Sequence, residues 1–230
     1  MEHHHKTQHG FDGPDCFGPE RLYHHSVWLR RLEKFTPGSG TKRSYLFLFF
    51  GSLYHTARVA FTQPQLFRTS RERLKIRAFV IATQLLWEIA AELAMPYSMF
   101  YLMLVPLAVS NFIMMSYVAT NHFISPMTEH TNDALVNSLT VRSNAIIERF
   151  HLFNNFHVEH HVLPYVNPVH ARLVASHLKR LWPDKYQEMG HIEALQRVSK
   201  RPRVYRNETT LINPRTERTA RTLPAHYLGD

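Results

Sequence analysis

Apolar residues are concentrated in the middle of the chain, and charged residues lie on both sides of this block. The block consists of two apolar stretches, residues 78–95 and residues 97–119, which Pro96 separates. An α-helix rises about 1.5 Å per residue and a hydrocarbon core is about 30 Å thick, so the second stretch spans it easily and the first barely does. The pattern therefore predicts a tight transmembrane helical hairpin over residues 78–119.

The charges that flank the hairpin predict its orientation. Arginine and lysine are dense between residues 68 and 77, directly ahead of the first stretch. Because cytoplasmic segments are enriched in these residues, both ends of the hairpin are expected on the cytoplasmic side. Residues 45–61 begin apolar but include Gly51, His55 and Arg58, so we expect an amphipathic segment lying in the membrane interface. A true span there is the alternative, and it would reverse the side of everything upstream.

Polar residues recur inside the first stretch. Gln84, Glu88 and Glu92 stand four positions apart and form one polar stripe on a helix. Such groups face a protein interior, a cavity or solvent. Two interpretations of this stripe stay open. In the first, Glu88 meets a polar partner and Glu92 reaches solvent at the far end of the helix. In the second, the stripe lies beside a substrate channel. In the second stretch, Pro106 predicts a kink.

Beyond the hairpin, the pattern predicts further helices and a basic tail. Asn167 and Pro168 have the chemistry of a helix N-cap followed by proline at the first helical position. The expected amphipathic helix runs through Trp182 and ends at Pro183. Its apolar side is expected to contain Leu173, Val174, Leu178 and Leu181. The basic residues 197–230 are expected to form a surface-bound or disordered tail.

Together these elements predict an all-α integral membrane protein, in which a transmembrane helical hairpin carries a cytoplasmic, histidine-rich metal-binding cap. We expect residues 1–77 to form part of the cap with the interfacial segment, and residues 78–119 to form the hairpin. Residues 120–195 are expected to complete the cap, and residues 196–230 to form the basic C-terminal tail.

Composition narrows the classes of function. The net charge of +9 suits either nucleic acid or an anionic membrane surface. The apolar block decides for the membrane, and no aromatic-interleaved basic pattern of a nucleic-acid reader is evident. Cys16 is the single cysteine, which excludes an intrachain disulfide and a Cys-x-x-Cys metal site. Histidine is the unusual residue, with 17 copies, many of them in clusters.

One histidine cluster has the spacing of a metal site. His157, His160 and His161 stand at positions i, i+3 and i+4, which lie on one face of a helix. Three neutral imidazoles aimed at one point suit iron, zinc, copper or nickel. Residues 3–5 form a second histidine cluster, which follows Glu2 as His160 follows Glu159. We infer that this second motif has lost its first histidine and that the chain begins inside a longer parent protein.

These motifs make the chain resemble the membrane fatty acid desaturase family. Members of that family carry three histidine boxes, the second and third of the form His-x-x-His-His, with a pair of spans between them. In this chain the third box matches in full and the second in part, at His157, His160 and His161 and at His3 and His4. Residues 119–133 resemble the segment ahead of the third box, and the resemblance covers about residues 1–185. The first box and the first hairpin of the family are absent.

The resemblance implies a pair of iron ions bound almost entirely by histidine. The implied ligands are His3, His4, His122, His157, His160 and His161, with His130 as the second choice to His122. Glu159, Glu2 and Asn155 are candidates to hydrogen-bond a ligand or an iron-bound water. The alternatives are an exposed glutamate and an asparagine that caps a helix.

The resemblance also implies an activity, the oxygen-dependent introduction of a C=C bond into a lipid acyl chain. Electrons would come from a separate b-type cytochrome or ferredoxin. The histidine boxes would face the cytoplasm from the bacterial inner membrane or, alternatively, from the endoplasmic reticulum. Alternatives are a related hydroxylase or ketolase acting on alkane, sterol or carotenoid, a non-catalytic fragment, and a disfavoured zinc-binding membrane protein. With its ligand set incomplete, the 230-residue chain is expected to be inactive alone.

Overall fold

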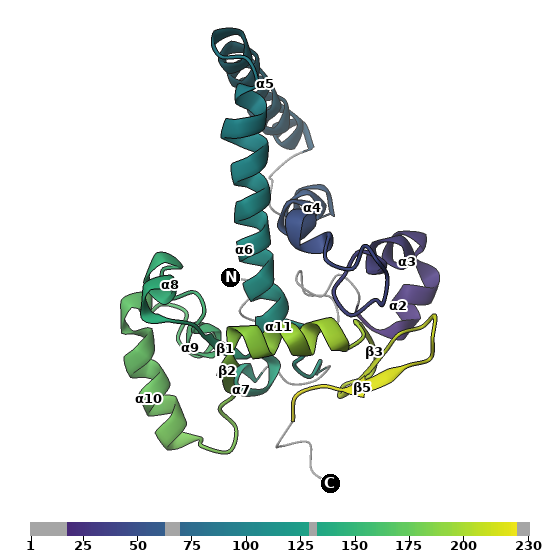
Figure 1. Cartoon of the computed structure of the whole chain (residues 1–230), viewed down its shortest axis with the longest axis vertical. Helices are drawn as coiled ribbons and strands as arrows, with labels where there is room; N and C mark the ends of the chain where they lie inside the picture. The colour runs from purple at the N-terminus through teal and green to yellow at the C-terminus, as the bar shows by residue number, and fades with distance from the viewer. Residues whose placement is uncertain (1–17, 63–69, 129–132, 225–230) are drawn as a thin grey trace. The chain divides into compact units, whose positions relative to one another are not determined.

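The computed structural model describes residues 18–62, 70–128 and 133–224, which Figure 1 draws in colour. These residues are mostly helical and divide into two compact units. One unit consists of residues 48–114, and the other combines residues 1–47 with residues 115–230. The expected all-α fold is correct in its helical majority only, because the second unit also contains two small sheets.

The unit of residues 48–114 is built from helices. They are most of α4 (Phe47–Thr62), α5 (Ser70–Ala94), the π-helix η2 (Met99–Leu104) and the start of α6 (Val105–His122). The side-chain oxygen of Asn111 in α6 accepts a hydrogen bond from the backbone N–H of Leu53 in α4, at 3.2 Å. The rings of Phe49 and Phe112 lie 5.0 Å apart between the same two helices.

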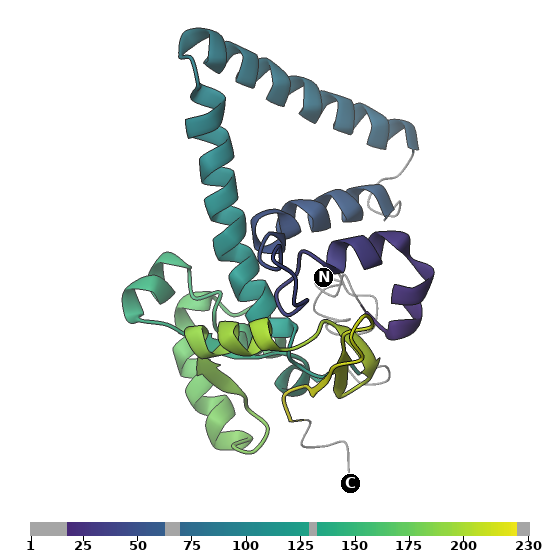
Figure 2. The same cartoon turned by 45° about the vertical axis from the view of Figure 1, so that its right-hand side comes forward.

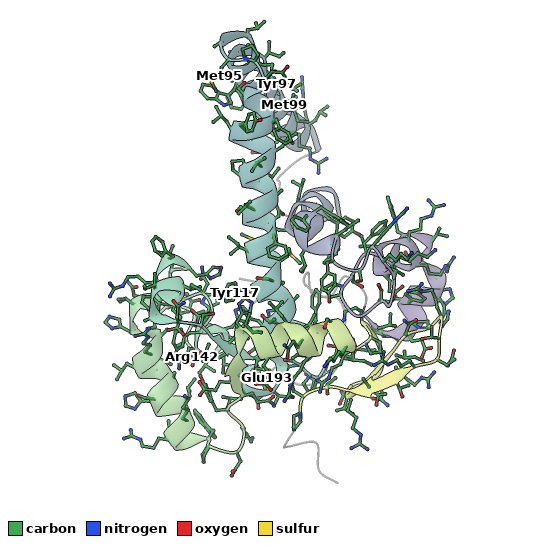
Figure 3. The ribbon with its side chains drawn as sticks, in the orientation of Figure 1. Met95, Tyr97, Met99, Tyr117, Arg142 and Glu193 are labelled. Carbon is green, nitrogen blue, oxygen red and sulfur yellow. The ribbon has the colours of Figure 1, made fainter. Side chains whose placement is uncertain are left out.

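The chain reverses between α5 and η2 (Figure 2), and Figure 3 labels Met95, Tyr97 and Met99 at this turn. The carboxylate of Glu92 accepts hydrogen bonds from the backbone N–H groups of Tyr97 at 2.9 Å and Met99 at 3.0 Å. It also accepts one from the Ser98 hydroxyl, at 3.1 Å. Glu92 therefore accepts hydrogen bonds from backbone N–H groups at the start of η2, where these groups have no partner within the helix.

The distortion expected at Pro106 takes the form of a π-helical segment directly ahead of it. The backbone N–H of Val105 donates to the carbonyl of Phe100, five residues earlier, instead of four. Proline lacks a backbone N–H, and its ring clashes with the carbonyl four residues before it. A π turn is a common way to absorb such an irregularity within a helix.

Among the described residues, one helix is long and apolar enough to cross a membrane. It combines η2 and α6 into a 24-residue helix, Met99–His122, with a mean hydropathy of 1.8. The other expected span lies within α5, which also carries the basic residues before residue 78 and the acidic residues Glu88 and Glu92. These charges lower its hydropathy, so a two-span hairpin stays a prediction.

The second unit contains the remaining elements and the end of α6. Its helices are α2 (Glu20–His25), α3 (Val27–Glu33), α7 (Ala134–Asn137), α8 (Ala145–Phe150), α9 (His157–Val162), the 3₁₀ turn η3 (Pro168–His170), α10 (Ala171–Leu181) and α11 (His191–Lys200). One core joins Leu135 of α7, Val158 of α9 and Leu178 of α10. Strand β1 (Thr140–Arg142) pairs in parallel with β2 (Glu188–Gly190), with Thr140 opposite Glu188.

Helix α10 begins as expected but buries a different face. The Asn167 side chain accepts a hydrogen bond from the backbone N–H of Val169, at 3.1 Å, and Pro168 occupies the first turn. The buried residues of α10 are Ala171, Ala175 and Leu178. The expected apolar face was partly wrong, since Leu173 and Leu181 are exposed. Small alanines face the protein here because large aromatic rings fill the adjacent space.

The C-terminal segment forms a three-stranded antiparallel sheet, which corrects the expected surface-bound or disordered tail. Its strands are β3 (Val204–Asn207), β4 (Thr210–Ile212) and β5 (Thr219–Arg221). Val204 pairs with Ile212, and Thr210 pairs with Arg221. The sheet is ordered because Val204, Leu211 and Ile212 are fully buried despite the polar residues around them.

This C-terminal segment holds the residues that follow α6. The hydroxyl of Tyr205 donates to the carbonyl of Ser125 at 2.8 Å, and the backbone N–H of Leu223 donates to the carbonyl of Ile124 at 2.7 Å. The buried guanidinium of Arg203 donates to the carbonyl of Phe123, at 3.0 Å. The chain directly after His122 is therefore fixed by residues that lie 80 or more positions away in the sequence.

Candidate metal centre

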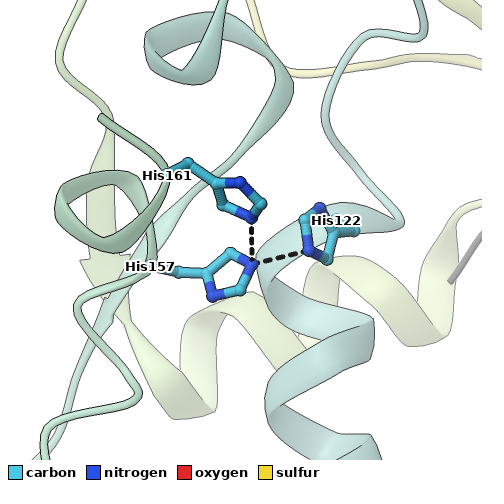
Figure 4. Close-up of side chains that lie close together, drawn as sticks. All are labelled: His122, His157 and His161. Atoms are coloured by element: carbon cyan, nitrogen blue, oxygen red, sulfur yellow. Dashed lines mark hydrogen bonds between the residues drawn. The ribbon is translucent and has the colours of Figure 1, made fainter. Parts of the chain in front are cut away.

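Three imidazoles meet where α6 ends and α9 begins (Figure 4). His122 is the last residue of α6, His157 is the first residue of α9, and His161 follows one turn later. The Nε2 atom of His157 lies 2.6 Å from Nε2 of His122 and 2.9 Å from Nε2 of His161. The candidate ligand atoms of the three residues all lie within 4.8 Å of one another.

The local sequence explains this convergence. Positions i and i+4 of a helix lie on one face, which brings His157 and His161 together. Val158, the residue after His157, is fully buried in the core with Leu135 and Leu178, and it fixes the opposite side of α9 against the protein. The histidine face is left to meet the end of α6.

The geometry and the donor chemistry fit a transition metal ion. A histidine nitrogen binds such an ion at about 2.0–2.1 Å, so two nitrogens on one ion lie about 3 Å apart. The two short nitrogen–nitrogen distances are close to this value. His122 and His161 are buried and His157 is partly buried. Imidazole donors suit iron, zinc, copper and nickel, and the burial limits the access of water to the site.

Glu159 ties the helix that carries these histidines to the small parallel sheet. Its carboxylate is 3% exposed and accepts hydrogen bonds from the Thr140 hydroxyl, at 2.6 Å, and from the Tyr186 hydroxyl. Thr140 lies in β1, and Tyr186 lies between α10 and β2. Burial raises the pKa of Glu159, although both hydrogen bonds oppose the shift. Burial and the nearby Glu159 charge also raise the pKa of Tyr186.

Comparison with known families decides the family of the chain. The family model for fatty acid desaturases matches residues 1–193. The chain belongs to the fatty acid desaturase family. The resemblance found in the sequence is thereby confirmed, and the family is one of membrane-associated oxidoreductases with a di-iron centre. No curated protein and no solved structure matches the chain.

The desaturase match spans every expected ligand, but the structure brings only some of them together. His122, His157 and His161 converge as described. The ring of His160 lies 6.1 Å from that of His157 and 5.8 Å from that of His161, between centroids, and it is not part of the converging group. Ligation by His160 stays a prediction. The other expected residues, His3, His4 and Glu2, and the second choice His130, lie outside the described residues.

Two residues expected to support the desaturase site have other partners. Glu159 accepts hydrogen bonds from Thr140 and Tyr186, and its contact with an imidazole or an iron-bound water stays a prediction. Asn155 is fully buried, and its side-chain NH₂ group donates to the carbonyl of Val141 at 2.9 Å. The backbone N–H of Val141 donates back to the carbonyl of Asn155, at 3.1 Å. Both residues therefore fasten the segment around the third box to β1.

A second buried carboxylate, which the sequence did not reveal, fastens α8. Glu148 is fully buried and forms ion pairs with Arg142, at 2.9 Å, and Arg172, at 2.7 Å. Although burial raises the pKa of Glu148, the hydrogen bonds from the two arginines hold it below its ordinary value. Figure 3 labels Arg142. The two arginines lie 6 and 24 positions away from Glu148 in the sequence, so no local spacing could have predicted these ion pairs.

Two further histidines stack on Tyr117, which Figure 3 also labels. The ring centroid of Tyr117 lies 4.0 Å from that of His151 and 4.1 Å from that of His191. The Tyr117 hydroxyl lies 3.2 Å from the Ser143 hydroxyl. Burial lowers the pKa of both histidines. These imidazoles are therefore held neutral and have a packing role beside the last turns of α6.

Proposed function

We propose that this chain forms the catalytic part of an oxygen-dependent fatty acyl desaturase, which introduces a C=C bond into a lipid acyl chain. The observation that carries the proposal is the convergence of the Nε2 atoms of His122, His157 and His161 in a chain of the desaturase family. When bound, iron supplies the oxidising power that is needed to remove hydrogen from an unactivated methylene group.

The residues of the chain have separate tasks in this proposal. His122, His157 and His161 bind one iron ion, and their burial keeps the site dry. His160, His3 and His4 contribute to the second iron ion of the pair. Thr140 and Tyr186 hold Glu159, and through it they hold α9 in the orientation that aims His157 and His161 at His122.

The proposed setting is a membrane. Residues 78–119 form a transmembrane hairpin, and the histidine boxes lie on its cytoplasmic face, in the bacterial inner membrane or the endoplasmic reticulum. An acyl chain then reaches the metal centre from the bilayer, and a b-type cytochrome or ferredoxin supplies electrons. Support comes from the family and from the apolar helix Met99–His122.

Metal analysis tests the first part of the proposal. We expect the purified chain to contain iron, and we expect His157→Ala to lose well over half of it, because His157 lies between the other two nitrogens. The matched control is His170→Ala, which removes an exposed imidazole from η3. Elemental analysis by mass spectrometry gives iron and zinc per chain. Zinc in place of iron, or equal iron in both variants, contradicts the proposal.

Product analysis tests the reaction itself. The gene, with any coding sequence that precedes Met1, is expressed in a host, and the fatty acids of the host lipids are separated by gas chromatography. We expect a new unsaturated acyl chain that the His157→Ala variant does not produce and the His170→Ala variant does. A hydroxylated or oxo product from the wild type would instead identify the related hydroxylase or ketolase reaction.

A further inference from the structure

Helix α8 and the loop after α9 expose large apolar side chains. In α8, Phe150 is 86% exposed and Ile146 is 69% exposed. In the loop, Leu163 and Val166 are also exposed. Figure 1 shows α8, α9 and α10 grouped at one side of their unit. Apolar side chains that are exposed together usually mark a contact with another protein or with a membrane.

These side chains form one continuous surface. One hollow is lined by Ile146, Phe150 and Phe153, together with Arg149 and Arg172. A second hollow is lined by Phe153, Leu163 and Val166, among other residues. Phe153 belongs to both hollows and joins them. We call Ile146, Phe150, Phe153, Leu163 and Val166 the apolar surface.

The charge around the apolar surface has one sign. Between residues 143 and 183 the acidic residues are Glu148 and Glu159, and they are 0% and 3% exposed. The basic residues of the same segment, Arg149, Arg172, Lys179 and Arg180, all reach the surface at least in part. Lys179 pairs with Glu188, and Arg172 pairs with the buried Glu148. Among the residues that line the two hollows, the exposed charged residues are Arg149 and Arg172, and both are positive.

We propose that the apolar surface inserts into the headgroup region of a membrane that contains anionic lipids. Segments that lie in a membrane interface combine an apolar face that contains leucine and phenylalanine with arginine or lysine beside it. Each such cation is attracted to the negative surface potential of an anionic leaflet. A second copy of the chain fits less well, because it would bring the arginines of both copies together without an exposed carboxylate between them.

This inference rests on the membrane association of the desaturase family and not on its metal chemistry. It gives α8 a position in the membrane interface, as the sequence also suggested for residues 45–61. It also places the loop after the third histidine box at the lipid surface, close to the residues that bind iron in the proposed function. Its test needs neither iron nor turnover, so the two proposals fail independently.

The test places an environment-sensitive label at single positions of the full chain. Cys16 is replaced by serine, and the variants Phe150→Cys and Leu163→Cys are labelled with a nitrobenzoxadiazole fluorophore. The matched control is Thr216→Cys, an exposed position in the turn between β4 and β5. Each protein is reconstituted into phosphatidylcholine vesicles that contain phosphatidylglycerol, with or without lipids that carry a nitroxide near the headgroup.

At residues 150 and 163 we expect blue-shifted emission and nitroxide quenching at least twice as strong as at residue 216. Quenching no stronger than at residue 216 overturns the proposal. Blue-shifted emission without lipid quenching also overturns it, because the apolar surface would then be covered by protein.

The charge argument has its own variant. Arg149→Glu changes an exposed side chain in α8 and leaves the buried Glu148 pairs in place. With the label at residue 150, we expect this variant to lose about half or more of its lipid quenching in vesicles that contain phosphatidylglycerol. In vesicles of phosphatidylcholine alone, we expect the change to be small. An equal loss in both kinds of vesicle overturns the anionic preference.

Discussion

Glu159 is the single residue whose contacts bear most directly on the orientation of the candidate metal centre. It lies between the converging histidines in the sequence, but its side chain faces away from them, towards Thr140 and Tyr186. A carboxylate at 3% exposure is costly unless its oxygens accept hydrogen bonds. The two hydroxyl groups therefore stabilise the buried carboxylate of Glu159 and, through it, the position of α9.

Removing one of these hydroxyl groups should loosen the helix. We expect Tyr186→Phe to lower the free energy of unfolding by about 1–3 kcal/mol, because an oxygen of Glu159 is left buried without a donor. Metal affinity should fall with it, since groups that hold ligands in place affect binding. Denaturant titration in mild detergent, followed by circular dichroism, measures the first effect. The control is Tyr165→Phe, whose side chain is 85% exposed, and equal stability of the two variants would contradict the assignment.

The histidines that flank Tyr117 predict a pH dependence of stability. Burial holds the pKa of His151 and His191 below the usual value of about 6.5. As the pH falls through about 6.5, the unfolded chain binds protons before the folded chain does, so stability is present above this pH and is lost below it.

His191→Phe keeps an aromatic ring against Tyr117 but removes one titrating group. We expect this variant to lose less unfolding free energy than the wild type between about pH 7.5 and about pH 5.5. The two proteins differ only at position 191, so the difference between the two slopes reports on His191. Parallel slopes in the denaturant titrations would show that His191 does not carry this dependence.

Single residues were predictable from the sequence where their partners are near in the chain. His157 and His161 share one helix face, and their spacing predicted that they meet, but the same spacing also included His160, which lies apart from them. His122 is 35 positions from His157, and only the family resemblance suggested it. Thr140 and Tyr186 carry no recognisable motif, because their role depends on the parallel pairing of β1 and β2.

At the scale of elements, the C-terminal sheet supports the end of α6. It begins at Val204, beyond the residues that match the desaturase family. Its contacts fall on Phe123, Ile124 and Ser125, the three residues after His122. Gly38 packs closely against the backbone just ahead of the sheet, since a Cβ atom there would lie 1.8 Å from the carbonyl oxygen of Arg201. This part of the chain accordingly helps to build the candidate site.

Arg203 is the residue through which this support can be tested. It is 4% exposed and donates to the carbonyls of Phe123, Val198 and Arg201. We expect Arg203→Ala to lower the free energy of unfolding by about 1–3 kcal/mol for each carbonyl left buried and unpaired, and to lower bound iron. Denaturant titration and elemental analysis measure the two effects. Arg218→Ala, an exposed change in the same sheet region, should leave both unchanged. Normal iron binding in Arg203→Ala would contradict this role.

The elements were predictable where local chemistry determines them. Asn167 and Pro168 defined the start of the helix that contains α10, because capping acts within a few residues. The apolar face of that helix was partly wrong, because alanine is weak evidence of burial in a sequence pattern. The sheet was missed since its few buried residues are separated by arginine, threonine and asparagine.

At the scale of the whole molecule, the helix Met99–His122 is, among the described residues, the one that is long and apolar enough to cross a membrane. Only 28% of its most apolar window is buried inside the protein, whereas the core helix of a soluble protein would be mostly buried. Long apolar helices with exposed side chains are stable in lipid, where their backbone groups are satisfied within the helix.

Membrane fractionation tests this placement. We expect the chain to stay in the membrane pellet after extraction with alkaline carbonate. The double variant Leu107→Arg and Ser110→Arg places two charges near the middle of the helix, each costing about 2.5–3.5 kcal/mol on insertion. This variant should move to the supernatant or be degraded. Release of the wild type, or full retention of the variant, would show that another part of the chain anchors it.

The positions of the apolar block and of the histidine-rich region along the chain were predictable, because each is defined by the composition of many consecutive residues. The two-span hairpin stays a prediction, because α5 combines a basic start with two glutamates in its apolar part.

The contacts between the segment after His122 and the C-terminal sheet also constrain the order of events during synthesis. Leu223, which donates to the carbonyl of Ile124, is synthesised well after α6 and the third histidine box. Helix α6 and the third histidine box emerge long before their support does. The final geometry around His122 is therefore reached only after residues 203–223 have been synthesised.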